Sequence, residues 1–102
     1  MIKGERRIRI AMSLMRALWG EVTPYLRAVL ARDAEPGGFQ IEFYVDGSIE
    51  DDFFESASSI EGEVMGDFSP NTWISHRVIR LDAPISIPVG DGLLVFLRKE
   101  SG

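Results

Sequence analysis

Hydrophobic positions in the first part of the chain repeat at the spacing of a helix. The segment "RRIRIAMSLMRALWG" places apolar side chains three or four residues apart, at Ile8, Ala11, Met12, Met15, Leu18 and Trp19. Side chains at this spacing share one face of a helix, which normally packs on a core. Gly20 favours the end of the helix. We therefore predict an amphipathic helix whose buried face is formed by these residues.

Two strands are predicted next. The segment "YLRAVLAR" reads as a strand from about Tyr25 to Arg32, and "DAEPGG" as a turn. The following segment "FQIEFYV" alternates, with one apolar face and one face formed by Gln40, Glu42 and Tyr44. The two strands should form a hairpin. Tyr44 should be the most exposed aromatic residue, because it lies on the polar face.

A second helix is predicted from the segment that begins at Ser48, which is a suitable N-cap. Its apolar residues, at spacings of four, three, four and four, are Phe53, Ala57, Ile60, Val64 and Phe68. We expect this stripe to be buried. The segment "SPNT" should end the helix, because proline and small polar residues favour turns.

The final third predicts two more strands, "WISHRVIRL" and "GLLVFLRKE", joined by the loop "DAPISIPVGD". The order is thus helix, strand, strand, helix, strand, strand. Two hairpins combine most simply into one antiparallel four-stranded sheet with both helices on one face. We predict a two-layer α+β fold. Its 102 residues form one domain over residues 1–102, in which residues 1–10 could be a flexible basic extension.

Charge is distributed unevenly along the chain. Residues 1–33 carry seven basic and three acidic side chains, residues 34–67 carry ten acidic and no basic ones, and residues 68–102 are nearly balanced. The acidic middle part would repel duplex nucleic acid and attract a basic protein. On the predicted helix, four of these carboxylates fall opposite the apolar stripe: Asp51, Asp52, Glu55 and Glu63. Gly62 and Gly66 fall on the same solvent side, where they leave backbone open to approach.

Catalytic and metal-binding patterns are sparse. The chain has no cysteine and a single histidine, His76, whose neighbour Ser75 would point to the opposite face of a strand. His76 acting alone as a general base is one reading, and a hydrogen-bonded sheet residue is the other. Asp51 and Glu55 lie one helical turn apart and could contact Mg²⁺, but no third ligand is indicated.

The basic N-terminal residues Lys3, Arg6, Arg7 and Arg9 leave two readings open. They could contact nucleic acid or lipid headgroups, or they could form a solvated chain end. The balance of the chain is acidic, which argues against a nucleic-acid binder. No apolar run approaches the roughly 20 residues that span a bilayer.

Several segments resemble one family of small bacterial proteins. They are "AMSLMRALWGEVTPYLRAV", "FYVDGSIEDDFFESASSIEGEV", "VIRLDAPISIP" and "FLRKE", which together cover about Ala11 to Glu100. In sequence and order they are similar to immunity proteins of contact-dependent growth inhibition and related polymorphic toxin systems. The chain departs from the family pattern at Trp19, Gly62 and Gly66, the two glycines standing where larger residues would be expected.

The resemblance implies a cytoplasmic inhibitor that is not an enzyme and that binds the C-terminal domain of a cognate toxin. Many such toxin domains are basic nucleases, so the acidic helix face would contact the toxin's substrate cleft. The candidate partner-binding residues are Glu42, Tyr44, Asp46, Asp51, Asp52, Glu55 and Glu63. No catalytic residue, metal or cofactor is expected, and neither is direct contact with nucleic acid or membrane. The alternatives are another protein-interaction module, or a ligand- or metal-binding protein that uses the acidic helix.

Overall fold

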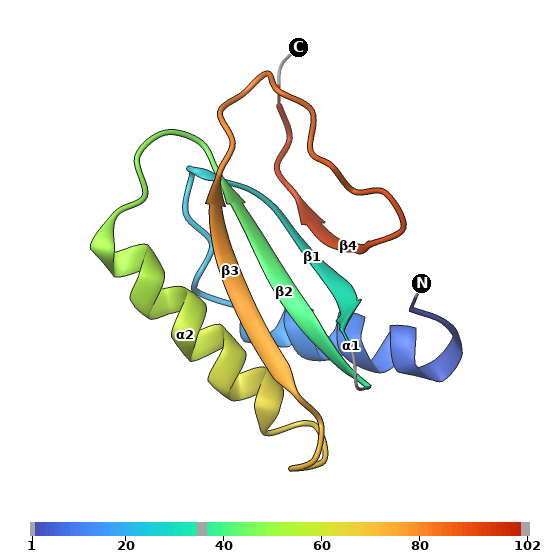
Figure 1. Ribbon diagram of the computed structural model, residues 1–102. Helices are drawn as coiled ribbons and strands as arrows, with labels where there is room; N and C mark the ends of the chain where they lie inside the picture. The colour runs from blue at the N-terminus through green and yellow to red at the C-terminus, as the bar shows by residue number, and fades with distance from the viewer. Residues whose placement is uncertain (1, 35–36, 101–102) are drawn as a thin grey trace.

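Two helices and four strands make up the computed structural model, which describes residues 2–34 and 37–100. In chain order the elements are α1 (Gly4–Ala17), β1 (Leu26–Ala34), β2 (Gly38–Val45), α2 (Asp51–Met65), β3 (Ile74–Arg80) and β4 (Leu93–Leu97). The predicted α+β class and element order are confirmed. Both helices pack on one face of the sheet (Figure 1), where they share a core with the strands. Residues 4–10, considered above as part of an extension, belong to α1.

The sheet is mixed, with strand order β3-β2-β1-β4, so the prediction of a purely antiparallel sheet is wrong. β1 pairs antiparallel with β2 and with β4, but β2 and β3 are parallel. The reason is that α2 carries the chain back along the sheet, and a strand that follows such a helical crossover runs parallel to the strand before it. β3 and β4 therefore occupy opposite edges and form no hairpin (Figure 1).

Helix α1 buries a different face from the one predicted. Its core residues are Ile10, Ser13, Leu14 and Ala17. The predicted stripe includes four residues that are exposed instead: Ile8, Met12, Met15 and Trp19. The two sets have similar helical spacing and lie on opposite sides of the helix, so periodicity alone could not choose between them.

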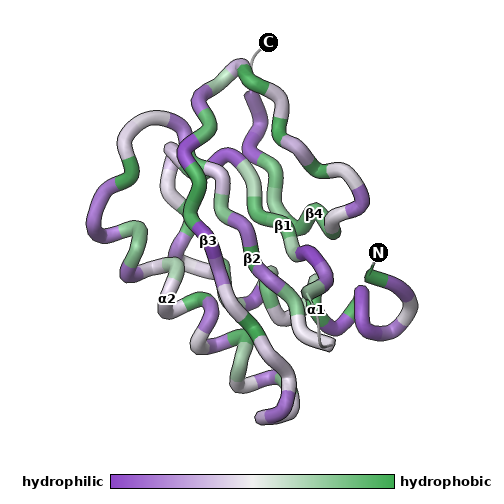
Figure 2. The backbone as a smooth tube through the Cα atoms, viewed as in Figure 1, coloured by the Kyte–Doolittle hydropathy of each residue, from purple (hydrophilic) through white to green (hydrophobic). Residues whose placement is uncertain are grey.

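Helix α2 buries the stripe that the sequence predicts. Phe53, Ala57, Ile60 and Val64 are buried, and hydrophilic and hydrophobic residues alternate around the helix in Figure 2. Phe68 lies beyond the end of the helix and is half-buried, with its ring edge-on to that of Phe39 at 5.3 Å between centroids. The helix begins two residues later than predicted, with Glu50 rather than Ser48 at the N-cap.

The second face of the sheet is partly covered as well. The segment of residues 81–92 crosses it between β3 and β4, and Ile87 and Val89 pack on Leu30 and Tyr44. Arg32 holds this segment on the sheet by donating hydrogen bonds to the carbonyls of Pro88 and Val89. Glu42 and Tyr44, which the sequence places on this face, are therefore buried, and Gln40 is half-buried.

Candidate functional site

The acidic face of α2 is formed by Asp51, Asp52, Glu55 and Glu63. All four side chains are exposed, as the sequence predicts. The helix Asp51–Met65 contains five acidic residues and no basic one. Asp51 and Asp52 lie in its first turn, where the positive end of the helix dipole stabilises negative charge. Such a face favours a cationic partner.

A mainly apolar hollow of about 290 Å³ lies beside the first turn of α2. Its lining residues are Thr23, Pro24, Tyr25, Val45, Ser48, Glu50, Asp52, Phe53 and Ser56. Tyr25 is exposed, and Glu50 and Asp52 add carboxylates to the lining. The hollow could accept an apolar side chain whose neighbours are basic. Sequence reasoning missed it, because the loop before β1 and the start of α2 are brought together only by the fold.

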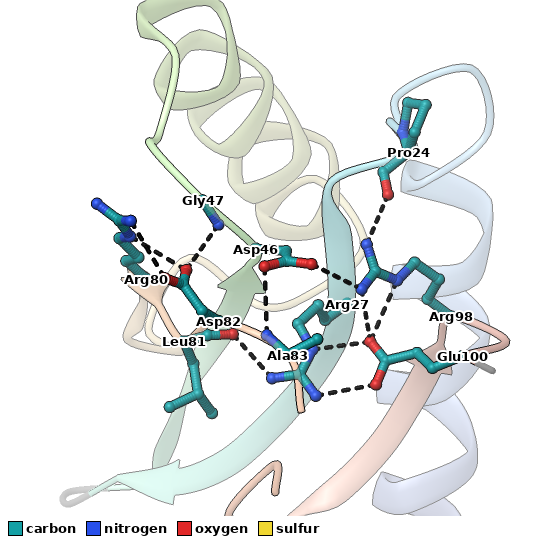
Figure 3. A network of polar contacts seen from close by, with 10 residues as sticks. All are labelled: Pro24, Arg27, Asp46, Gly47, Arg80, Leu81, Asp82, Ala83, Arg98 and Glu100. Carbon is teal, nitrogen blue, oxygen red and sulfur yellow. Dashed lines mark hydrogen bonds and ion pairs between the residues drawn. The ribbon is translucent and has the colours of Figure 1, made fainter. Parts of the chain in front are cut away.

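Asp46 belongs to a polar network that holds the ends of several strands (Figure 3). Its carboxylate accepts a hydrogen bond from Arg98 Nη2 at 3.0 Å and one from the Ala83 N–H at 3.2 Å. Arg98 also donates to the Pro24 carbonyl and to Glu100. The Asp46 side chain thus joins the end of β2 to the segments that follow β3 and β4.

Two further carboxylates complete the network. Glu100 accepts hydrogen bonds from Arg27 at 2.7 and 2.9 Å. Together with Arg98, these bonds lower the pKa of Glu100 to about 2. Asp82 accepts from Arg80 and from the Gly47 N–H, and both bonds lower its pKa.

The network joins three of the segments that carry the family resemblance, "FYVDG", "VIRLD" and "FLRKE". Their charged residues bond to one another and to nearby backbone groups (Figure 3). These segments therefore stabilise the fold, and the acidic face of α2 lies outside the network.

Glu42 and Tyr44 are buried, at 5% and 4% exposure, so the prediction that they lie on an open face is wrong. The same oxygen, Glu42 Oε1, accepts hydrogen bonds from Arg32 Nε and from the Tyr44 hydroxyl, each at 2.8 Å. Burial, together with the bond to Glu42, raises the pKa of the Tyr44 phenol. The physical reason is tertiary: the segment of residues 81–92 covers this face, and Arg32 neutralises the buried carboxylate.

His76 is a hydrogen-bonded sheet residue, the second of the two readings. Its Nδ1 lies 2.8 Å from Glu61 Oε1 of α2, while Ser75 is bonded to Gln40 on the other face. The two side chains thus point apart, as predicted. Within residues 2–34 and 37–100, no group of three or more His, Cys, Asp or Glu side chains is placed to hold a metal ion. Over the same residues, no helix has the length and apolar character needed to cross a membrane.

Comparison with known proteins bears on this combination of fold and charge. The sequence matches the model of the MafI2 immunity protein family over residues 7–100. No curated protein matches it. An immunity protein binds and neutralises a toxin, and proteins of this kind are generally not enzymes, in agreement with the resemblance described above. Because the match covers nearly the whole sequence, the chain belongs to the MafI2 immunity protein family.

Proposed function

We propose that the protein neutralises its toxin by docking the acidic face of α2 on a basic surface of that toxin. The observation that carries the proposal is the charge of α2, whose five carboxylates have no basic residue among them. Asp51, Asp52, Glu55 and Glu63 are all exposed. Within the described residues no hydrogen bond or ion pair engages these four side chains, so their charge is available to a partner.

The toxin that best fits this surface is a nuclease. A nuclease binds phosphate with basic residues, and carboxylates arranged along a helix can occupy the same cleft. Charge complementarity of this kind accelerates encounter and excludes wrong partners more than it raises affinity. Affinity also needs an apolar anchor, for which the hollow beside Tyr25 and Phe53 provides a pocket.

The proposed contact surface is smaller than the set of candidates drawn from the sequence. Glu42 and Tyr44 are buried, and Asp46 is engaged by Arg98 and Ala83. We therefore restrict the toxin-contacting carboxylates to the acidic face. In this proposal the toxin belongs to a contact-dependent or related polymorphic system, and inhibition takes place in the cytoplasm by occlusion of the active site.

Co-purification with the toxin domain encoded next to its gene tests the proposal. We expect a stable complex in which the nuclease activity of the toxin is lost, and protection of cells that express both proteins. A folded protein that neither binds nor protects against that domain would contradict the proposal. Stoichiometric metal in the purified protein, together with no toxin binding, would favour the ligand-binding alternative.

A further inference from the structure

The outer side of α1 carries a row of large apolar side chains that the structure leaves uncovered. Ile8, Met12 and Met15 of α1, and Trp19 two residues past its end, are 59%, 64%, 50% and 79% exposed. Their spacing of four, three and four residues aligns them opposite the buried residues Ile10, Leu14 and Ala17. We call them the α1 stripe. A continuous apolar row of this kind marks an interaction surface, whereas single exposed apolar residues do not.

The charge around the α1 stripe indicates what covers it. The helix Gly4–Ala17 contains four arginines and one glutamate, a net charge of +3. Arg7, Arg9 and Arg16 are exposed beside the stripe; Arg16 forms an ion pair with Asp67 of the same chain and Arg9 donates to the Asp67 carbonyl, while Arg7 points to solvent. A matching surface should have room for large apolar side chains and should be bordered by carboxylates.

The outer side of α2 has these properties. Opposite its buried residues it presents Glu55, Ser59, Gly62 and Gly66, at the same spacing of four, three and four. A Cβ atom at Gly62 would meet nothing within 4 Å. Asp51, Asp52 and Glu63 flank this row, and the net charge of the helix is −5. Large side chains between basic residues on α1 thus correspond to Ser59, Gly62 and Gly66, which lie between acidic residues on α2.

We propose that two copies of the chain associate through their helical layers, with the α1 stripe of each copy packed on the outer side of α2 of the other. Both helices lie on the same face of the sheet (Figure 1). A two-fold axis that bisects the angle between them, in the plane of the layer, therefore brings α1 onto α2 of the second copy twice. The result is a closed, isologous dimer.

This dimer goes beyond toxin neutralisation and has a consequence for it. Because each α1 stripe covers Glu55 and its neighbours on the second copy, a basic toxin and a second copy compete for the same helix. Toxin binding should therefore convert dimers into one-to-one complexes.

Sedimentation velocity, measured from micromolar to submillimolar concentration, tests the dimer. Trp19→Ser removes the most exposed residue of the stripe, and Gly62→Leu fills the space on α2. Either change should raise the dimer dissociation constant about tenfold or more. Trp73→Ser is the matched control, because Trp73 is 53% exposed and belongs to neither the α1 stripe nor the outer side of α2. This variant should dimerise like wild type.

Mixing the two variants distinguishes this interface from others. Trp19→Ser keeps an intact α2, and Gly62→Leu keeps an intact α1 stripe. A heterodimer of the two variants therefore has one unaltered α1–α2 contact, whereas each homodimer has none. The mixture should form this heterodimer at a concentration at which each variant alone stays monomeric. A Gly62→Leu protein that dimerises normally would overturn the proposal, and so would a wild-type protein that stays monomeric. Monomers that bind vesicles of anionic phospholipid would assign the stripe to a membrane surface instead. Capture of the toxin by Trp19→Ser, which keeps its acidic face, reports on the proposed function separately.

Discussion

Gly38 lies where β2 begins and where the backbone approaches Trp73 most closely. A Cβ atom at this position would be 1.8 Å from the Trp73 carbonyl oxygen, which accepts a hydrogen bond from the Phe39 N–H. We predict that Gly38→Ala lowers the free energy of unfolding by at least about 1–3 kcal/mol, because the start of β3 must move away from β2. Urea unfolding of dilute protein measures this.

Gly62→Ala is the control for that substitution, since the added methyl group meets open space. It should leave stability unchanged or raise it by up to about 1 kcal/mol, because alanine favours a helix interior. If the two variants unfolded at the same urea concentration, the close approach at Gly38 would have no energetic role.

Glu100 makes stability depend on pH at the acidic end. Its pKa is lowered from 4.5 to about 2 by hydrogen bonds from Arg27 and Arg98. A carboxylate with a lowered pKa in the folded state stabilises the protein above its unfolded pKa, and this contribution is lost as pH falls from about 4.5 towards 2. Glu100→Gln should therefore lower Tm at pH 7.

The difference in Tm between wild type and Glu100→Gln should shrink as pH falls through that range. Thermal unfolding followed by circular dichroism between pH 7 and pH 3 measures it. A difference in Tm that is constant over the whole range would show that the charge of Glu100 has no part in its effect.

At the scale of elements, α2 connects the core to the proposed contact surface. Phe53 is buried in its first turn, with its ring edge-on to Phe43 at 5.7 Å between centroids. Phe53→Ala should cost roughly 3–5 kcal/mol of stability, a large part of the total for a small domain. Phe54→Ala is the control, because Phe54 is exposed and should cost much less. Denaturant unfolding of both variants decides whether the facing of α2 is as described.

The two helices differ in how well the sequence predicts their buried faces. In α2 a single apolar stripe stands opposite carboxylates, so only one facing is physically reasonable, and that facing is observed. In α1 two apolar rows stand on opposite sides. The row with Ile10 and Leu14 is buried, and the row with Met12 and Met15 stays exposed. A helix that is apolar on both sides signals a second contact, but the sequence does not show which side meets the sheet.

The sequence located the strands and the hairpin of β1 and β2, but it did not show how β3 and β4 pair. Alternation in "FQIEFYV" predicts a strand, and β2 is Gly38–Val45. Pairing depends on the path of the connections. A helix of 15 residues between β2 and β3 makes the crossover that gives the parallel pair, and the segment of residues 81–92 takes the chain to the far edge. A second hairpin, formed by β3 and β4, was the simpler arrangement. The hydrophobic pattern within each strand does not show which strands pair, so it could not exclude that hairpin.

At the scale of the whole molecule, one group of candidate residues stabilises the fold and another faces solvent. The exposure of the acidic face followed from helix geometry, because its spacing relative to Phe53 and Ala57 fixes its direction. The burial of Glu42 could not be predicted, because it depends on the distant segment of residues 81–92 that covers its face. The network around Asp46 could not be predicted either, because its partner Arg98 lies 52 residues away. A carboxylate in a strand has the same local signature whether it meets solvent or an arginine.

The kinetics of toxin binding test the central claim, that the acidic face of α2 attracts the toxin. The variant Asp51→Asn/Asp52→Asn/Glu55→Gln/Glu63→Gln changes only exposed side chains, so the fold should be retained. Glu5→Gln is a control that removes an exposed acidic charge from α1. Stopped-flow association is followed at nanomolar concentration over a series of salt concentrations.

We predict that the fourfold variant associates with the toxin domain about tenfold or more slowly than wild type at low salt. The difference should shrink as salt rises, because screening acts over about 8–10 Å at physiological ionic strength. Glu5→Gln should lower the rate only slightly, since it removes a single negative charge, and from the basic helix α1 rather than from the acidic face. Equal association rates for wild type and the fourfold variant at low salt would contradict the account and would show that the carboxylates of α2 only face solvent.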